Sequence, residues 1–400
     1  MHMDTPSACA LCVSVMRDLI TKRIFMNFID LAAQQKRIRS KIEANIHAVL
    51  DHGQYIMGPE IQELENRLAA YVGIRHAISC SSGTDALLMA LMAYDVGQGD
   101  IIFTTPFTFI ASAEVISLLG ATPVFADIDP RTFNIDPAKL EEAIETAKHR
   151  GENIRGIIAV NIFGQPAEYD QINAIAKKHG LFVIEDAAQS FGGDYQGRKS
   201  CSLADIACTS FFPAKPLGAY GDGGSAFTGD DALAEKMVSI RIHGTGSNKY
   251  DNARIGINGR LDVIQAAILL AKLDIFPEEA GLRQQVAQRY TDAFISHSLL
   301  TPPVVPEGMQ SIWAQYSVLA ADEQHRAAIQ DHLRAEGIPT AIYYPIPLHL
   351  QPAFAYLKYS AGDFPVSEDC SRRIFSLPMH PYLEKKDQDR IIKHVLNVGK

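Results

Sequence analysis

Residues 156–189, GIIAVNIFGQPAEYDQINAIAKKHGLFVIEDAAQ, contain two short apolar runs with a longer helical segment between them. The runs over 156–162 and 181–185 predict strands, and the segment over 168–178 predicts a helix. A strand, a helix and a strand in this order indicate two parallel strands joined by a crossover helix. Ligands bind at the carboxyl ends of such strands, which is where an acidic pair, residues 185 and 186, stands.

The same alternation of short apolar runs and helices precedes this stretch. Two helical segments come first and three further strand–helix pairs follow, which together predict a mainly parallel sheet with helices on both faces. The first helices are expected over 30–50 and 60–71, the strands over 76–82, 100–105 and 122–128, and the helices after them over 84–94, 110–119 and 139–148.

Further along the chain the pattern changes. The predicted strands over 205–212 and 225–228 are joined by a connection without room for a crossover helix, so we expect an antiparallel addition to the sheet. A helix over 260–273 follows. The predicted sheet has seven strands. We therefore expect an α/β fold in which a large domain over 26–275 contains this sheet and a smaller α+β domain covers 276–400.

Composition and charge exclude several kinds of protein. The 400 residues are 47% hydrophobic and 21% charged, which is ordinary for a globular chain with a sizeable core. With 37 basic and 46 acidic residues the net charge is -9, and we expect no nucleic-acid partner. Because no apolar run approaches the ~18 residues of a membrane span, we expect no membrane-spanning segment.

The six cysteines are sparse, and only Cys9 and Cys12 form a CxxC pair. No second pair completes a zinc site, so we predict reduced thiols, no bound metal and a cytoplasmic protein. Residues 1–25 carry neither a helix cap nor the order of charge, apolar run and cleavage site of a signal peptide. A coherent segment begins at Met26, and we expect residues 1–25 to be a disordered extension.

Three short segments carry chemistry. Residues 81–87, SSGTDAL, lie where a strand gives way to a helix, and the free N–H groups of a helix N-terminus bind phosphate, although such a cap is more often without a ligand. Asp186, in EDAAQ at 185–189, ends a strand and is placed either to meet a ligand or to cap the next segment. Lys215, in SFFPAKPL at 210–217, stands among prolines and apolar residues, where desolvation lowers the pKa of an amine and makes it a nucleophile. The alternative is a lysine that extends from a loop into solvent.

Together, these segments match what pyridoxal phosphate requires. The lysine holds the aldehyde as a Schiff base, the carboxylate keeps the pyridine nitrogen protonated, and the helix end holds the phosphate. In these three segments and in several others, the chain resembles the DegT/DnrJ/EryC1/StrS family of sugar-nucleotide aminotransferases, which are fold-type-I pyridoxal-phosphate enzymes. The resemblance runs from about residue 27 to the C-terminus and rests on GQYIMGPE at 53–60, SGTDAL at 82–87, PFTF at 106–109, EDAAQ at 185–189, SFFPAK at 210–215, GINGRLD at 256–262, YYP at 343–345 and PLH at 347–349.

The resemblance implies a role for each residue at a matching position. Lys215 is the implied catalytic residue, which links to the cofactor and then moves a proton between substrate and cofactor. The implied cofactor contacts are Asp186 at the pyridine nitrogen, Gln189 near the ring hydroxyl, Phe109 on the ring face, the backbone of Thr84 and Asp85 with the Ser210 hydroxyl at the phosphate, and Asn258 at the phosphate from the neighbouring subunit of a homodimer.

Within the family, Lys215 argues against the branch that removes a hydroxyl, because that branch carries histidine in its place. The runs over 53–60 and 209–224 are most similar to the enzymes that use glutamate to aminate C3 of UDP-2-acetamido-2-deoxy-3-oxo-glucuronate in O-antigen and lipopolysaccharide biosynthesis, with pyridoxamine phosphate as the intermediate. The alternatives are amination at C4 or of another keto sugar, and a sensor that binds pyridoxal phosphate without turnover.

A uronate adds a carboxylate to the diphosphate of the substrate, so cationic groups are expected near it. Four basic residues stand in a predicted loop just before Asn258 and are either substrate ligands or exposed charges. They are Arg241, His243, Lys249 and Arg254. The implied substrate-binding residues are Arg241, Tyr344 and His349.

Overall fold

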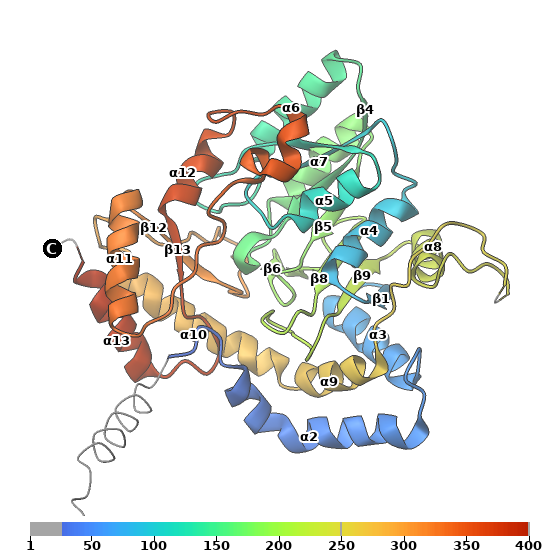
Figure 1. Ribbon diagram of the computed structural model, residues 1–400, viewed down its shortest axis with the longest axis horizontal. Helices are drawn as coiled ribbons and strands as arrows, with labels where there is room; N and C mark the ends of the chain where they lie inside the picture. Colours follow the sequence, from blue (N-terminus) through green and yellow to red (C-terminus); the bar gives the residue numbers. More distant parts are fainter. Residues whose placement is uncertain (1–25, 249, 399–400) are drawn as a thin grey trace, which may run out of the picture.

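The computed structural model describes residues 26–248 and 250–398 (Figure 1). Three predictions fall outside these residues: the disordered extension over 1–25, the Cys9–Cys12 pair within it, and the place of Lys249 in the basic loop. The first described helix, α2 (Leu31–His52), runs along one end of the molecule, at the bottom of Figure 1. It packs on α9 (Val263–Leu273), which was predicted from residue 260.

A seven-stranded sheet forms the centre of the molecule. Its strands are β1 (His76–Cys80), β2 (Asp100–Thr104), β3 (Thr122–Phe125), β4 (Asn153–Val160), β5 (Phe182–Asp186), β8 (Ile206–Ser210) and β9 (Gly224–Thr228). Their order across the sheet is β1-β9-β8-β5-β4-β2-β3. The five strands from β8 to β3 pair in parallel, whereas β9 is antiparallel to both β8 and β1. The mainly parallel sheet and its antiparallel addition are therefore confirmed.

Helices cover both faces of the sheet. Successive side chains of a strand point to opposite faces, so each strand contributes apolar side chains to both helix layers. Ile78 and Ala226 pack with one helix layer, whereas their neighbours Ala77 and Phe227 pack with the other. The first layer consists of α4 (Gly83–Ala93), α5 (Ala111–Leu118) and α8 (Asp231–Arg241). The second consists of α3 (Pro59–Val72), α9, α6 (Pro137–His149) and α7 (Tyr169–His179).

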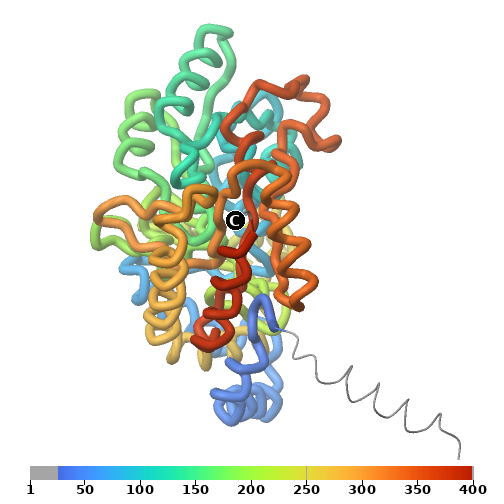
Figure 2. Tube along the Cα trace, turned by 90° about the vertical axis from the view of Figure 1, so that its left-hand side faces the viewer, coloured from blue at the N-terminus to red at the C-terminus, as the bar shows by residue number. Residues whose placement is uncertain are grey.

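A second sheet lies in the C-terminal part of the chain, which faces the viewer in Figure 2. It has three antiparallel strands, β10 (Leu300–Thr301), β12 (Tyr316–Ala320) and β13 (Ile374–Leu377). The helices packed on it are α10 (Phe276–Phe294), α11 (Glu323–Ala335) and α13 (Lys385–Leu396). A further helix, α12 (Pro365–Arg373), leads directly into β13.

The two parts of the chain also share a small sheet. Its strands are β6 (Asp194–Tyr195), β7 (Arg198–Lys199) and β11 (Met309–Gln310). Because β11 pairs with β6, the C-terminal part is joined to the larger part by backbone hydrogen bonds. The predicted domain boundary between residues 275 and 276 stays a prediction. Over residues 26–248 and 250–398, no helix combines the length and the apolar character needed to cross a membrane.

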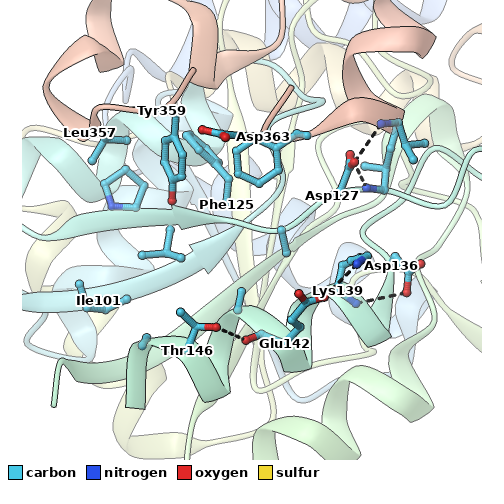
Figure 3. A pocket seen from close by; sticks show the side chains of 18 of the residues that line it. Ile101, Phe125, Asp127, Asp136, Lys139, Glu142, Thr146, Leu357, Tyr359 and Asp363 are labelled. Carbon is cyan, nitrogen blue, oxygen red and sulfur yellow. Dashed lines mark hydrogen bonds and ion pairs between the residues drawn. The ribbon is translucent and has the colours of Figure 1, made fainter. Parts of the chain in front are cut away.

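Asp127, just after β3, caps a helix of the C-terminal part (Figure 3). Its carboxylate accepts hydrogen bonds from the N–H groups of Val366 and Ser367, both at 2.9 Å, and from the Ser367 hydroxyl at 2.6 Å. These groups belong to the first turn of α12, whose N-cap residue Phe364 provides no side-chain bond of its own. The cap stands at one end of a cavity of about 520 Å³ between β3, α6 and residues 357–366, which none of the predicted site residues lines.

Replacing Asp127 with alanine should destabilise the protein, because the buried Ser367 N–H and the half-buried Val366 N–H lose their charged acceptor. Since a hydrogen bond to a charged group contributes about 1.5–3 kcal/mol, we expect Asp127→Ala to lower the free energy of unfolding in urea by about 3 kcal/mol. Asp331→Ala removes an exposed acid of α11 and should change it by less than about 0.5 kcal/mol. Equal stability of the two variants would contradict the capping role.

Candidate active site

The site forms where β5 and β8 end, at neighbouring positions in the middle of the sheet. Asp186 is the last residue of β5, and Lys215 lies in the loop that leads from β8 to β9. The N-terminus of α4 follows β1, which is separated from β8 by β9 alone. The three segments predicted to carry chemistry therefore meet at one edge of the sheet, where ligands of parallel sheets bind.

Asp186 is a buried carboxylate with 5% of its surface exposed. Burial raises the pKa of Asp186 above its ordinary value, and the hydrogen bonds it accepts from the Ser112 hydroxyl (2.7 Å) and the Ala188 N–H (3.1 Å) oppose that rise. Ser112 in turn lies 3.1 Å from the Thr108 hydroxyl. Neither Ser112 nor Thr108 was among the predicted site residues, although Thr108 belongs to the PFTF motif at 106–109 and Ser112 lies in the first turn of the helix after it.

Glu185, next to Asp186, has a different task, because adjacent residues of a strand face opposite sides of the sheet. Its carboxylate accepts the N–H groups of Cys201 (2.9 Å) and Leu203 (3.0 Å) and the Ser200 hydroxyl (2.6 Å). These bonds fold the loop before β8 against β5. Of the acidic pair, Asp186 alone stays available to a ligand.

Lys215 is held in a compact loop between β8 and β9. The loop is closed by hydrogen bonds from the Ala219 N–H to the Phe211 carbonyl and from the Phe211 N–H to the Gly223 carbonyl, both 2.7 Å, and the Lys215 N–H itself bonds to Phe212. Burial lowers the pKa of Lys215 to about 8, whereas the nearby Asp186 carboxylate acts in the opposite direction. A larger fraction of this amine is therefore neutral near pH 7 than for a lysine in water.

The first turn of α4 provides two free N–H groups. Ser82 is its N-cap residue, and the Ser82 hydroxyl and carbonyl accept the N–H groups of Asp85 and Ala86, both at 3.0 Å. The first four N–H groups of a helix have no partner within the helix, so those of Gly83 and Thr84 remain for a ligand. The predicted backbone contact of Asp85 is thus corrected: its N–H is already bonded, and its carboxylate accepts the Ser81 and Ser82 hydroxyls.

The Ser210 hydroxyl stands beside this turn. A Cβ atom on Gly83 would lie 2.7 Å from the Cβ of Ser210, so only glycine allows the end of β8 to approach α4 this closely. The Ser210 oxygen accepts the Phe212 N–H at 3.2 Å, and its own proton is free to be donated. An anion bound to the Gly83 and Thr84 N–H groups therefore has the Ser210 hydroxyl beside it as a further hydrogen-bond donor.

An aromatic wall lies next to Asp186. The side-chain oxygen of Gln189 accepts the Phe163 N–H at 2.6 Å, and its nitrogen donates to the Tyr344 hydroxyl at 3.1 Å. Burial raises the pKa of Tyr344. The ring of Phe109 is 55% exposed, with its centre 6.4 Å from that of Tyr344. The structure therefore brings three predicted residues, Phe109, Gln189 and Tyr344, together.

Arg241 does not stand in an open basic loop, and that prediction is wrong. It is the last residue of α8, only 3% exposed, and its guanidinium bonds to the Glu65 carboxylate and, at 2.8 Å, to the Ser79 carbonyl. Within the described part of the chain, all the hydrogen bonds of this guanidinium are made by Nη1, while its Nε is buried without a partner. Of the four basic residues predicted in this loop, His243 and Arg254 are the two described residues that follow α8.

His349 is likewise enclosed, at 2% exposure. Its Nε2 lies 3.1 Å from the Glu368 carboxylate, its ring packs edge-on against Phe364 and its Nδ1 has no hydrogen-bond partner among the described residues, so its contact with substrate stays a prediction. Burial lowers the pKa of His349, and Glu368 opposes this. Asn258 is exposed, and its side-chain oxygen accepts the Arg260 Nε at 3.0 Å.

These residues fit pyridoxal phosphate. The N–H groups of Gly83 and Thr84 match a phosphate, the Asp186 carboxylate retains acceptor capacity for a protonated ring nitrogen, and the Lys215 amine is nucleophilic near neutral pH. The exposed Phe109 ring offers a face for an aromatic ring. A phosphate site, a carboxylate and an activated lysine at one sheet edge define a site of the aminotransferase class.

The chain belongs to the DegT/DnrJ/EryC1/StrS aminotransferase family, whose sequence profile matches residues 36–396. It is 51% identical over 359 residues to a UDP-2-acetamido-2-deoxy-3-oxo-D-glucuronate aminotransferase from Pseudomonas aeruginosa, covering 90% of this chain and 96% of that protein. An aminotransferase structure from Brucella abortus superposes with a TM-score of 0.90 at 47% identity, covering 94% and 100% of the two chains. DesV from S. venezuelae superposes with a TM-score of 0.88 at 36% identity, covering 92% and 97%. The predicted family, fold class and aminotransferase activity are confirmed.

The lowered pKa of Lys215 predicts a pH profile for its reactivity. Only the neutral amine reacts with acetic anhydride, so labelling of Lys215 in the cofactor-free protein should rise with pH and level off above a midpoint of about 8. Lys139 provides the control, because its exposed amine pairs with Glu142, which raises its pKa above 10.5. Mass spectrometry of the two peptides measures both midpoints. A Lys215 midpoint near 10.5 would contradict the desolvated site.

Proposed function

We propose that this protein binds pyridoxal phosphate at the Asp186–Lys215 site and transfers an amino group from glutamate to a keto-sugar nucleotide. The observation that carries the proposal is the placement of Asp186, Lys215 and the free N–H groups of α4 at one edge of the sheet. The likeness to the P. aeruginosa enzyme supports C3 of UDP-2-acetamido-2-deoxy-3-oxo-glucuronate as the aminated position. This substrate places the reaction in O-antigen and lipopolysaccharide sugar biosynthesis.

Each residue of the site then has a task. When bound, the cofactor supplies an electron sink that stabilises negative charge on the reacting carbon. The amine of Lys215 would move a proton between that carbon and the bound cofactor, as transfer of the amino group requires, and a pKa of about 8 suits an acid–base group at neutral pH. The Asp186 carboxylate holds a proton on the ring nitrogen, and Ser112 keeps this carboxylate oriented. The N–H groups of Gly83 and Thr84 bind the phosphate.

The choice of substrate is tested with purified protein, glutamate and a panel of keto-sugar nucleotides. The panel contains the 3-oxo-glucuronate, the matching 3-oxo-glucose derivative without the carboxylate, and a 4-keto sugar. We expect the highest kcat/KM for the 3-oxo-glucuronate, by about 100-fold, with the amino sugar and 2-oxoglutarate as products in mass spectrometry. Lys215→Ala should fold, lose the absorbance of the Schiff base between lysine and cofactor, and transfer no amine.

The outcomes separate the alternatives. Preference for the 4-keto sugar or for the substrate without the carboxylate would replace the proposed substrate but keep the aminotransferase. Binding of pyridoxal phosphate without amine transfer to any member of the panel would favour a sensor. Turnover by Lys215→Ala would refute the assigned role of this lysine.

We also propose that the active unit is a homodimer in which Asn258 reaches the phosphate of the neighbouring subunit. Exposed apolar side chains on several loops support this, since large apolar groups in water mark interaction surfaces. They are Tyr55, Ile56, Met57, Phe109, Phe212 and Ile255. The four cysteines at positions 80, 201, 208 and 370 are buried free thiols, which supports a reducing compartment such as the cytoplasm. Recovery of the protein in a periplasmic fraction would contradict that location.

Mixing two defective chains tests whether the site is shared. Lys215→Ala and Asn258→Ala chains are unfolded together and refolded, and activity is measured at limiting pyridoxal phosphate. If Asn258 acts across the interface, one site of each mixed dimer is intact, and the mixture should recover about a quarter of the wild-type activity. If Asn258 serves its own chain, every site carries a defect and the mixture stays at the level of the separate variants.

A further inference from the structure

A buried lysine stands next to the loop that carries Lys215. Lys272 is near the end of α9, with only 1% of its surface exposed. Burying an ammonium group is unfavourable unless hydrogen bonds and opposite charges compensate for it, so a lysine in this position needs an explanation. None of the roles described above involves Lys272.

The contacts of Lys272 point to this loop. Its Nζ donates a hydrogen bond of 2.6 Å to the carbonyl of Gly218, three residues after Lys215. The same ammonium lies 4.2 Å from the centre of the Tyr220 ring, at cation–π distance. Burial lowers the pKa of Lys272 to about 8, and the Glu279 carboxylate opposes this. Carbonyl, aromatic ring and carboxylate together compensate for the buried charge.

The loop is tightly folded around Gly218 and has a second bond to α9. A Cβ atom on Gly218 would lie 2.4 Å from the Pro213 carbonyl, so only glycine allows the chain to fold back on itself this tightly in the loop of Lys215. A second bond reaches the loop from the same helix, since the side-chain oxygen of Gln265 accepts the Tyr220 N–H at 2.9 Å. Helix α9 therefore bonds to the loop at two points, and Gly218, the partner of Lys272, is nearer in sequence to Lys215 than Tyr220, the partner of Gln265.

Glu279 connects this contact to the rest of the fold. It lies on α10, buried, and accepts two hydrogen bonds from Gln34 of α2, at 2.9 and 3.0 Å, and one from the Tyr382 hydroxyl. A carboxylate fixed from both sides in this way provides a stationary negative charge for Lys272. The ammonium is thus bonded to the loop carbonyl and lies in the field of a carboxylate that is fixed in place.

We propose that Lys272 is a positioning residue, which fixes the β8–β9 loop through the Gly218 carbonyl so that the amine of Lys215 stays directed towards Asp186. The proposal rests on the role assigned to Lys215 under the proposed function. It assigns to Lys272 no contact with substrate or cofactor. Its effect is confined to the loop over 211–223, which distinguishes it from a general contribution to the stability of the core.

The test compares Lys272→Met, which keeps the length of the side chain but removes the donor, with Lys272→Arg, which keeps a donor. Lys236→Met is the matched control, because the Lys236 amine also donates to a backbone carbonyl, that of Ala93 at 2.9 Å, away from the site. Hydrogen exchange is measured on the full-length, cofactor-free chains. We expect the peptide over 211–223 to exchange about ten-fold faster in Lys272→Met, with the β4 and β5 peptides unchanged and Lys272→Arg in between.

A second measurement reports on the amine itself. The acetic anhydride midpoint of Lys215 should move from about 8 towards 10.5 in Lys272→Met, because a loosened loop lets water reach the amine, and should not move in Lys236→Met. Unchanged exchange and an unchanged midpoint would overturn the proposal, and so would equal acceleration in every peptide. If Lys272→Met does not fold, Lys272→Arg and Gln265→Ala are judged by the same criteria.

These measurements need no turnover, so the two proposals fail separately. Amine transfer by Lys215→Ala would remove the role of Lys215 and leave the loop result standing. A loop that is indifferent to residue 272, in a protein that still transfers amine through Lys215, would remove only the role of Lys272.

Discussion

Asp186 ends the central strand of the sheet, and helices on both faces keep its carboxylate out of water. A buried carboxylate is stable only with donors and cations around it. The Ser112 hydroxyl and the Ala188 N–H supply two donors, and the parallel pairing of β5 with β8 brings the loop of Lys215 to the same place. The pairing of β5 with β8 therefore places the acid and the lysine together.

Most of the fold could be predicted because its signals are local. The strand–helix alternation depends on neighbouring residues, and so does the environment of Lys215 between prolines. Helix α8 also had a local signal, an Asp230 cap before apolar residues at positions 234, 237 and 240, which was overlooked. The place of Arg241 could not be predicted, because its partner Glu65 stands 176 residues earlier in the chain.

The details of the site required the structure for a similar reason. The SSGTDAL motif locates the start of α4, but only the cap geometry shows that Ser82 takes the Asp85 N–H and leaves those of Gly83 and Thr84. The hydroxyl that orients Asp186 comes from Ser112, 74 residues away, and no sequence pattern joins the two. A motif thus identifies the kind of chemistry, whereas the donors that adjust it come from distant segments.

Glu279 has a consequence for the biosynthesis of the protein. Its carboxylate receives Gln34 from the beginning of the chain and Tyr382 from near its end, and it faces the lysine that holds the Gly218 carbonyl. Because a chain emerges from the ribosome with its N-terminus first, these surroundings are complete only after almost all residues have been translated. A prematurely terminated chain would contain Lys215 without the finished loop, so a correctly aimed amine is a property of full-length molecules.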